Sequence, residues 1–155
     1  MEPWKTAMQR GLVGGATSSL LSTAALAALG QREAGSPYAP TNAVSHWLYG
    51  DKAASHYEAS ARYTLPGYLI HHGSAMFWSV LVERVCGDLF DRRNSALTLG
   101  VGTAAAAVAC FVDYQLTPDR LKPGYEKHLS RPALAVVYGV FGVGLAIGAM
   151  LSRRA

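Results

Sequence analysis

The sequence predicts an all-α fold, a membrane-embedded four-helix bundle, on two observations. Four apolar stretches of close to twenty residues occupy positions 11–30, 67–85, 95–112 and 132–151. A helix rises about 1.5 Å per residue and the hydrocarbon core is about 30 Å thick, so a span needs roughly twenty mostly apolar residues. The first and last stretches contain no charged residue. Because four spans and their connections use the whole chain, we expect one integral membrane domain over residues 1–155.

The distribution of charge indicates membrane topology and not nucleic-acid binding. The formal net charge is +4 and the pI is near 9.2, but the basic residues lie at the ends of apolar stretches and form no long run. The densest basic clusters are in residues 83–94 and 152–155. Lysine and arginine close to span ends stay on the cytoplasmic side, so we expect both termini in the cytoplasm and no nucleic-acid partner.

The first stretch, 11–30, has two interpretations. Lys5 and Arg10 precede it, and the small residues around Ala25 and Ala27 would suit a cleaved signal peptide. The stretch is long for a signal core, however, and it carries small residues of the kind that pack against neighbouring helices. We therefore expect a retained span.

The polar connection 31–66 contains a further short helix in our interpretation. Pro40 precedes a capping Thr41 or Asn42, and Gly50 can end the helix. Val44, Trp47 and Leu48 would share one apolar face. This pattern predicts an interfacial helix over 41–49 that lies on the outer membrane surface, or alternatively a helix packed within the loop.

Small residues line faces of the first and last spans and predict close helix packing. Helices in lipid associate through close backbone approach and not through hydrophobic contact, so such faces would close the bundle or form a homo-oligomer. The predicted packing residues are Gly11, Gly15, Ser19, Gly139, Gly142, Gly144 and Gly148.

Polar side chains are concentrated in the second and third spans. His71 and His72 lie near the outer end of the second span, and Asp113 lies at the outer end of the third, so a contact between histidine and aspartate is expected. Glu83 lies at the inner end of the second span, on a stripe with His72 that could line a polar path or form a packed face. These four residues form the candidate polar site.

All five histidines fall on the outer side in this topology. Candidate outer-loop ligands are His46, His56 and His128. Imidazoles with a carboxylate could bind a metal ion or haem iron, but no HxxxH, HExxH, CxxC or CxxCH motif occurs. The sequence therefore predicts no cofactor, and leaves a metal or haem as the alternative.

Three segments carry a family resemblance: SHWLYGDKA at 45–53, GYLIHHGSAMFWSVLVER at 67–84 and DYQLTPDRLKPGYEKHLS at 113–130. They resemble a group of small multi-pass proteins of the bacterial inner membrane that have no assigned function. The resemblance implies the bacterial inner membrane as the location and assigns no catalytic residue.

Two classes of function follow from these patterns. The first is a non-enzymatic accessory or structural membrane protein that contacts lipids, a second copy of itself or another membrane protein through its helix faces and outer surface. The second is a protein that ligates metal or haem, or relays protons, at the site of His71, His72 and Asp113. We expect the first.

Overall fold

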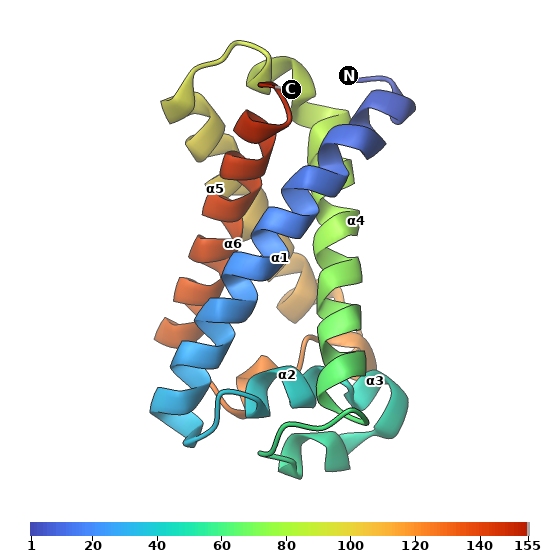
Figure 1. Cartoon of the computed structure of the whole chain (residues 1–155), viewed down its shortest axis with the longest axis vertical. Coiled ribbons are helices and arrows are strands. Elements are labelled where there is room, and N and C mark those ends of the chain that lie inside the picture. The colour runs from blue at the N-terminus through green and yellow to red at the C-terminus, as the bar shows by residue number, and fades with distance from the viewer. Residues whose placement is uncertain (155) are drawn as a thin grey trace. The chain divides into compact units, whose positions relative to one another are not determined.

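The computed structural model describes residues 1–154, and within them the chain is helical with no β-strand. Most of the described chain lies in four long helices, which Figure 1 labels α1, α4, α5 and α6. Their bounds are Trp4–Ala34, Thr64–Phe90, Ser95–Phe111 and Arg131–Leu151, in that order. Helix α5 continues into one turn of π-helix at Val112–Leu116. The prediction of an all-α protein is confirmed.

Two short helices and three 3-10 turns form the connections. Helix α2 covers Ala39–Val44 and helix α3 covers His46–Tyr49. The 3-10 turns are Asp51–Ser55, Asp119–Leu121 and Tyr125–Lys127. Ordered turns therefore occupy much of the two long connections between the main helices.

The chain divides into two compact units. The first unit consists of Met1–Ser22, His72–Ala109 and Tyr138–Ala155, and the second consists of Thr23–His71 and Cys110–Val137. The boundary falls inside α1, α4, α5 and α6, so each of these helices contributes residues to both units.

Three helices are long and apolar enough to cross a membrane. They are Trp4–Ala34, Ser95–Leu116, which includes the π-turn, and Arg131–Leu151. The first, third and fourth predicted stretches are therefore confirmed as helices that are able to span a membrane, although α1 extends beyond 11–30 at both ends. Helix α4 is 27 residues long but is not among the three.

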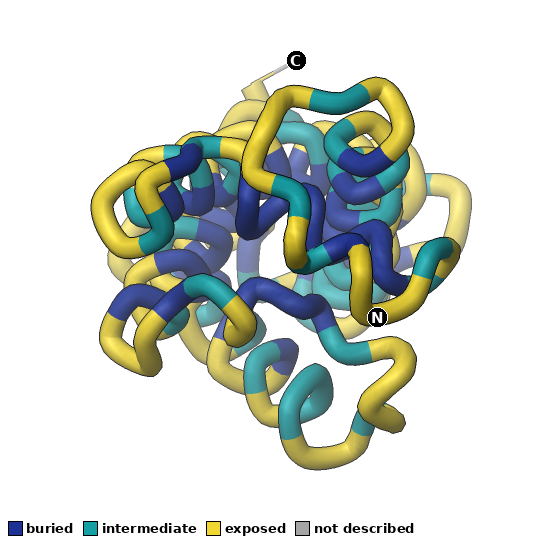
Figure 2. Tube along the Cα trace, turned by 90° about the horizontal axis from the view of Figure 1, so that it is seen from below, coloured by how far each residue is buried: buried dark blue, intermediate teal, exposed yellow. Residues whose placement is uncertain are grey.

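Helix α4 separates its polar and apolar residues onto opposite faces with a period of four. Gly67 and His71 in the second unit, and Ala75, Ser79 and Glu83 in the first, are buried. Large apolar side chains, each more than half exposed, occupy the opposite face: Leu65, Leu69, Phe77 and Val85. Figure 2 shows the same alternation of buried and exposed positions along the helices. The predicted stripe through His72 and Glu83 is corrected in part: Glu83 is buried, whereas His72 is only half-buried and His71 is buried in its place.

Close glycine contacts hold the helices of the first unit together. A Cβ atom at Gly11 would lie 2.6 Å from the Cα of Val80 on α4, and one at Gly142 would lie 2.8 Å from the carbonyl oxygen of Gly102 on α5. The predicted packing residues with such contacts are Gly11, Gly15, Gly142, Gly144 and Gly148. The prediction that Gly139 makes a close packing contact is wrong, since nothing lies within 4 Å of a Cβ placed there.

The second unit has a core built around α2. Leu26, Val44, Tyr125, Leu129 and Val137 are buried together. Every residue of α2 is buried, which fits a helix packed within the loop and not one exposed on a surface. The predicted single helix at 41–49 is corrected to two helices that begin at Ala39 and meet at Ser45.

The expected apolar face of that helix is also corrected. Val44 is 1% exposed whereas Leu48 is 63% exposed, so the two side chains do not share a face. Gly50, with φ of +71°, ends α3 as the sequence predicts.

Candidate functional site

Two clusters of polar side chains contain predicted site residues, one in each unit. The charged cluster of the first unit consists of Glu2, Arg10, Glu83, Asp91 and Arg153. The centre of this cluster is the guanidinium of Arg153. Its Nη1 and Nη2 atoms each donate to one carboxylate oxygen of Glu83 at 2.9 Å, and its Nε donates to Asp91 Oδ1 at 2.8 Å. The Arg153 and Glu83 side chains are only 6% and 3% exposed.

Backbone carbonyls complete the surroundings of Arg153. Nη1 also donates to the carbonyl oxygen of Ala149 at 3.0 Å, and Nη2 donates to that of Gly87 at 3.2 Å. A guanidinium has five N–H donors, so every donor of Arg153 has an acceptor. Because unpaired buried charge is costly, this full set of partners is what allows the ion pair to be buried.

A second arginine links the cluster to the first residues of the chain. Arg10 Nη1 donates to Asp91 Oδ1 at 2.9 Å and to Glu2 Oε1 at 3.4 Å. Burial by itself raises the pKa of Asp91, but the hydrogen bond from Arg153 and the charges of both arginines outweigh burial and lower the pKa overall. The carboxylate therefore stays ionised at neutral pH, and the cluster is a fixed ion-pair network.

The helices position these groups through their ends. Glu83 lies in the last two turns of α4, Asp91 follows the end of α4 at Phe90, and Arg153 follows the end of α6 at Leu151. Arg153 also lies over the Phe90 ring, 5.2 Å from its centroid. The sequence predicted Glu83 as a polar-path or packing residue, and the structure places it in a buried ion pair.

His72 belongs to the first unit and has a separate partner. Its Nδ1 shares a hydrogen bond of 2.9 Å with the hydroxyl of Ser19 on α1. Ser19 is fully buried. The predicted packing residue Ser19 thus contributes a polar contact between α1 and α4.

The neutral cluster of the second unit consists of His71 and Tyr125. His71 Nδ1 lies 2.8 Å from the Tyr125 hydroxyl oxygen, and the two rings meet edge to face with centroids 5.9 Å apart. Both side chains are buried. Tyr125 reaches this position because Gly124 adopts φ of +94° just before it, a conformation that favours glycine.

Asp113 acts on the same tyrosine through its charge. Burial raises the pKa of Tyr125 well above its usual range, and the carboxylates of Asp113 and Glu126 raise it further. The tyrosine is therefore neutral. His71 and Asp113 thus belong to one unit and both act on Tyr125, His71 through a hydrogen bond and Asp113 through its charge, whereas their predicted companions His72 and Glu83 belong to the other unit. Adjacent residues on a helix point about 100° apart, which separates His71 from His72.

The three outer-loop histidines each have a local partner. His46 Nδ1 lies 2.8 Å from the carbonyl oxygen of Ala43. His56 Nδ1 lies 2.9 Å from Glu58 Oε1, and its ring stacks on Tyr63 at 3.9 Å. His128 meets the Tyr57 ring edge to face. Within residues 1–154, no three His, Cys, Asp or Glu side chains come together as metal ligands do.

Asn42 organises the first connection, a role that the sequence analysis missed. Its Nδ2 donates to the carbonyl oxygens of His56 at 3.0 Å and Glu58 at 2.9 Å, and its Oδ1 accepts from the Thr64 hydroxyl at 2.6 Å. Asn42 is fully buried inside α2. The prediction that it could cap the helix is wrong, since the helix begins three residues earlier.

Sequence reasoning also missed Arg153, Asp91 and Tyr125. Arg153 was interpreted as a topology signal because it lies in the basic cluster after the last apolar stretch. One signal points to Arg153. A carboxylate within an apolar helix needs a cation as its partner. Glu83 lies near the end of its helix, and arginines are concentrated near helix ends, so one of them is the partner to expect. Tyr125 gave no signal, because an aromatic residue in an outer loop is usually interfacial.

Comparison with protein-family models, with curated proteins and with solved structures finds no match to this chain.

Proposed function

We propose that this chain is a four-span protein of the bacterial inner membrane, with α4 as the fourth span, and that it acts as a non-enzymatic accessory or structural protein. The observation that supports α4 as a span is its division into two faces. His71, Ser79 and Glu83 are buried, while the exposed face of α4 carries large apolar side chains. A hydropathy average combines the two faces and underestimates how apolar the lipid-facing side is.

The other three long helices expose the same kind of surface. Exposed apolar side chains on α1, α5 and α6 include Leu12, Leu20, Leu99, Val108, Val136 and Val143. Soluble proteins rarely expose so many large apolar residues on every long helix. A surface of this kind suits lipid, and the charged groups lie at or beyond the helix ends.

The polar interior supports a structural role. Glu83 and His72, the candidate polar residues of the first unit, are engaged by Arg153 and Ser19. A general acid or base must face a substrate, whereas the Glu83 carboxylate accepts from Arg153 and the His72 ring shares a hydrogen bond with Ser19. The helix faces and the connections are then the parts that contact lipids, a second copy or another membrane protein.

The test of the fourth span is cysteine accessibility in intact cells. Single cysteines at Ala59, Arg92 and Arg120, each exposed, are made in a background without Cys86 and Cys110. A membrane-impermeant maleimide should label A59C and R120C in intact cells, and R92C only after permeabilisation. Labelling of A59C and R92C from the same side would exclude α4 as a span.

A second candidate function, proton relay, is favoured by one observation in the second unit. His71 and Tyr125 share a buried hydrogen bond, and the Asp113 charge acts on Tyr125. An imidazole hydrogen-bonded to a phenol, with a carboxylate that acts on the same phenol, is a set of groups that can pass a proton. Metal or haem ligation at His71 or His72 is the other form of this candidate, and it predicts a chromophore or stoichiometric metal in the purified protein.

Conservative variants separate the two functions. H71Q, Y125F and D113N approximately keep side-chain size and remove the titratable group. Cells that need the chain should grow normally with all three variants if the role is structural, and should lose the chain's effect with each variant if the role is proton relay. A metal analysis and absorption spectrum of wild type, H71A and H72A test the ligation form.

A further inference from the structure

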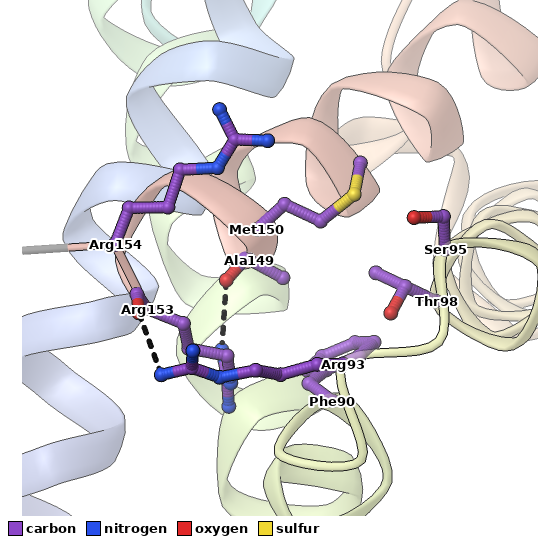
Figure 3. Close-up of a pocket in the computed structure, with 8 residues that line it drawn as sticks. All are labelled: Phe90, Arg93, Ser95, Thr98, Ala149, Met150, Arg153 and Arg154. Carbon is purple, nitrogen blue, oxygen red and sulfur yellow. Dashed lines mark hydrogen bonds between the residues drawn. The ribbon is translucent and has the colours of Figure 1, made fainter.

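A cavity of about 220 Å³ opens in the first unit where α4 ends, α5 begins and α6 ends. Figure 3 shows its lining. Arg93, Arg153 and Arg154 supply guanidinium groups, Ser95 and Thr98 supply hydroxyls, and Met150 is one of the apolar lining residues. The cavity is separate from the neutral cluster and adjoins the charged cluster only through Arg153.

The three arginines of the cavity are not equivalent. Arg153 is neutralised by Glu83 and Asp91. Within residues 1–154, no carboxylate lies at ion-pair distance from Arg93 or Arg154. Arg93 Nη2 donates to the carbonyl oxygen of Arg153 at 3.3 Å, and Figure 3 shows the Arg93 side chain running along one side of the cavity toward Arg153. The cavity therefore holds two positive charges that the described part of the chain leaves uncompensated.

The start of α5 adds hydrogen-bond donors to these charges. Helix α5 is 17 residues long, and Asn94 Oδ1 accepts from the backbone N–H of Leu97 at 2.9 Å. The first N–H groups of a helix lack partners within the helix and favour an anion. Ser95 is the first residue of α5 and lines the cavity.

Thr98 provides the independent sign of a ligand. Thr98 is 2% exposed, and within residues 1–154 its hydroxyl makes no hydrogen bond. By contrast, the hydroxyls of Thr17 and Thr103 each donate to the carbonyl oxygen four residues earlier in the helix. In Figure 3 the hydroxyls of Thr98 and Ser95 point toward the space between Met150 and Arg93. Buried polar groups are normally paired, so an oxygen acceptor in the cavity would complete this site.

We infer that this cavity binds a phosphate group through Arg93, Arg154, Ser95 and Thr98. Guanidinium groups, hydroxyls and a helix N-terminus are the donors that bind phosphate oxygens. The phosphate comes either from the headgroup of an anionic phospholipid or from free phosphate. The inference goes beyond the proposed function and does not depend on whether α4 spans the membrane.

The test is native mass spectrometry of the full chain in a neutral detergent, titrated with phosphatidylglycerol, phosphatidylcholine or inorganic phosphate. We expect R93Q to weaken binding of the phosphate probe by roughly tenfold, as for the loss of one charge-assisted hydrogen bond. T98V, which removes the hydroxyl and keeps the volume, should weaken it by a smaller factor. R92Q is the matched control, because Arg92 is exposed, carries the same charge and does not line the cavity.

The two sources give different results. Phosphatidylglycerol binding that depends on Arg93 and resists inorganic phosphate identifies a lipid headgroup. Binding of inorganic phosphate with the same dependence, and none of phosphatidylglycerol above phosphatidylcholine, identifies free phosphate. Competition between the two shows one site open to both.

Two results would overturn the inference. One is that none of the probes binds. The other is that R92Q and R93Q weaken binding equally, since that indicates diffuse surface charge. Thermal unfolding of each variant checks that it folds. R93G is a second variant that removes the guanidinium, and it should fold because Arg93 has φ of +51°, a conformation that glycine adopts readily.

Discussion

The two units of this chain bury polar side chains by opposite means. In the first unit the interior group with the most partners is a full charge, the guanidinium of Arg153, held by Glu83 and Asp91. In the second unit the interior contacts are between neutral groups, such as the Asn42 amide with backbone carbonyls and the Tyr125 hydroxyl with His71. Both units expose apolar residues on their long helices.

The difference follows from what each unit contains. The first unit brings together the ends of α4 and α6 with the start of α1, where arginines and carboxylates are close in sequence to helix termini. The second unit contains the long connections, whose backbone carbonyls and hydroxyls accept and donate without charge. A charged interior depends on a few strong contacts, while a neutral interior depends on many weaker ones.

The largest expected effect comes from breaking the ion pair of the first unit. E83L leaves the buried Arg153 guanidinium with one carboxylate, so we expect a loss of about 3–5 kcal/mol in the free energy of unfolding. Unfolding in mixed micelles at increasing denaturing detergent measures it. The double variant E83L/R153M should recover much of that loss, because both members of the pair are gone.

The control for this prediction is D88N. Asp88 pairs with the N-terminal amine at 2.8 Å, but both groups are about two-thirds exposed. Exposed pairs contribute about 0–1 kcal/mol. Equal losses for E83L and D88N would contradict the assignment of a buried network in the first unit.

The matching test in the second unit is Asn42. N42A removes three hydrogen bonds and leaves the His56 and Glu58 carbonyls without a donor, so we expect a loss of about 3 kcal/mol. N42D keeps the acceptor for the Thr64 hydroxyl and loses only the donors. Limited proteolysis should show faster cleavage near residues 56–58 in N42A, and unchanged cleavage there would argue against Asn42 as the anchor.

Helix packing within the first unit gives a third, smaller effect. A Cβ at Gly102 would overlap the carbonyl oxygen of Gly142, so G102A should cost about 1–3 kcal/mol. G139A is the matched substitution in open space, and it should be neutral or slightly stabilising because alanine favours a helix. Thermal unfolding of both variants measures the difference, and a stable G102A would show that α5 and α6 can separate without cost.

The smallest effect concerns pH and the second unit. Burial lowers the pKa of His128 below its usual 6.5, and the charge of Lys127 lowers it further. Between pH 6.5 and that lower value the unfolded chain binds more protons than the folded chain, so stability falls as the pH falls. H128Q should reduce this acid-side decline relative to wild type in unfolding measured from pH 7.5 to 5. An identical pH profile for H128Q would show that His128 does not contribute.

Several features were predictable because they depend on local pattern. The apolar stretches predict α1, α5 and α6 as long helices, and Gly50 predicts the end of α3. The length of α2 and the burial of all its residues were not predictable, because they depend on packing against Tyr125 and Leu129 from a distant part of the chain.

The candidate site was predictable in part. The sequence singles out Glu83, His71 and Asp113 as polar groups that need partners, since each lies in or beside an apolar stretch. It does not identify Arg153 or Tyr125 as the partners of Glu83 and His71, which are 70 and 54 positions away along the chain.

The sequence by itself determined an all-α chain in which three of the four predicted stretches are membrane-capable helices. Only the tertiary structure decided how the polar residues are divided, with His71 beside Tyr125, His72 beside Ser19 and Glu83 bound to Arg153. The physical reason is geometric. A rotation of about 100° separates neighbouring side chains on a helix, and the choice of which one faces a given partner depends on how the helices pack.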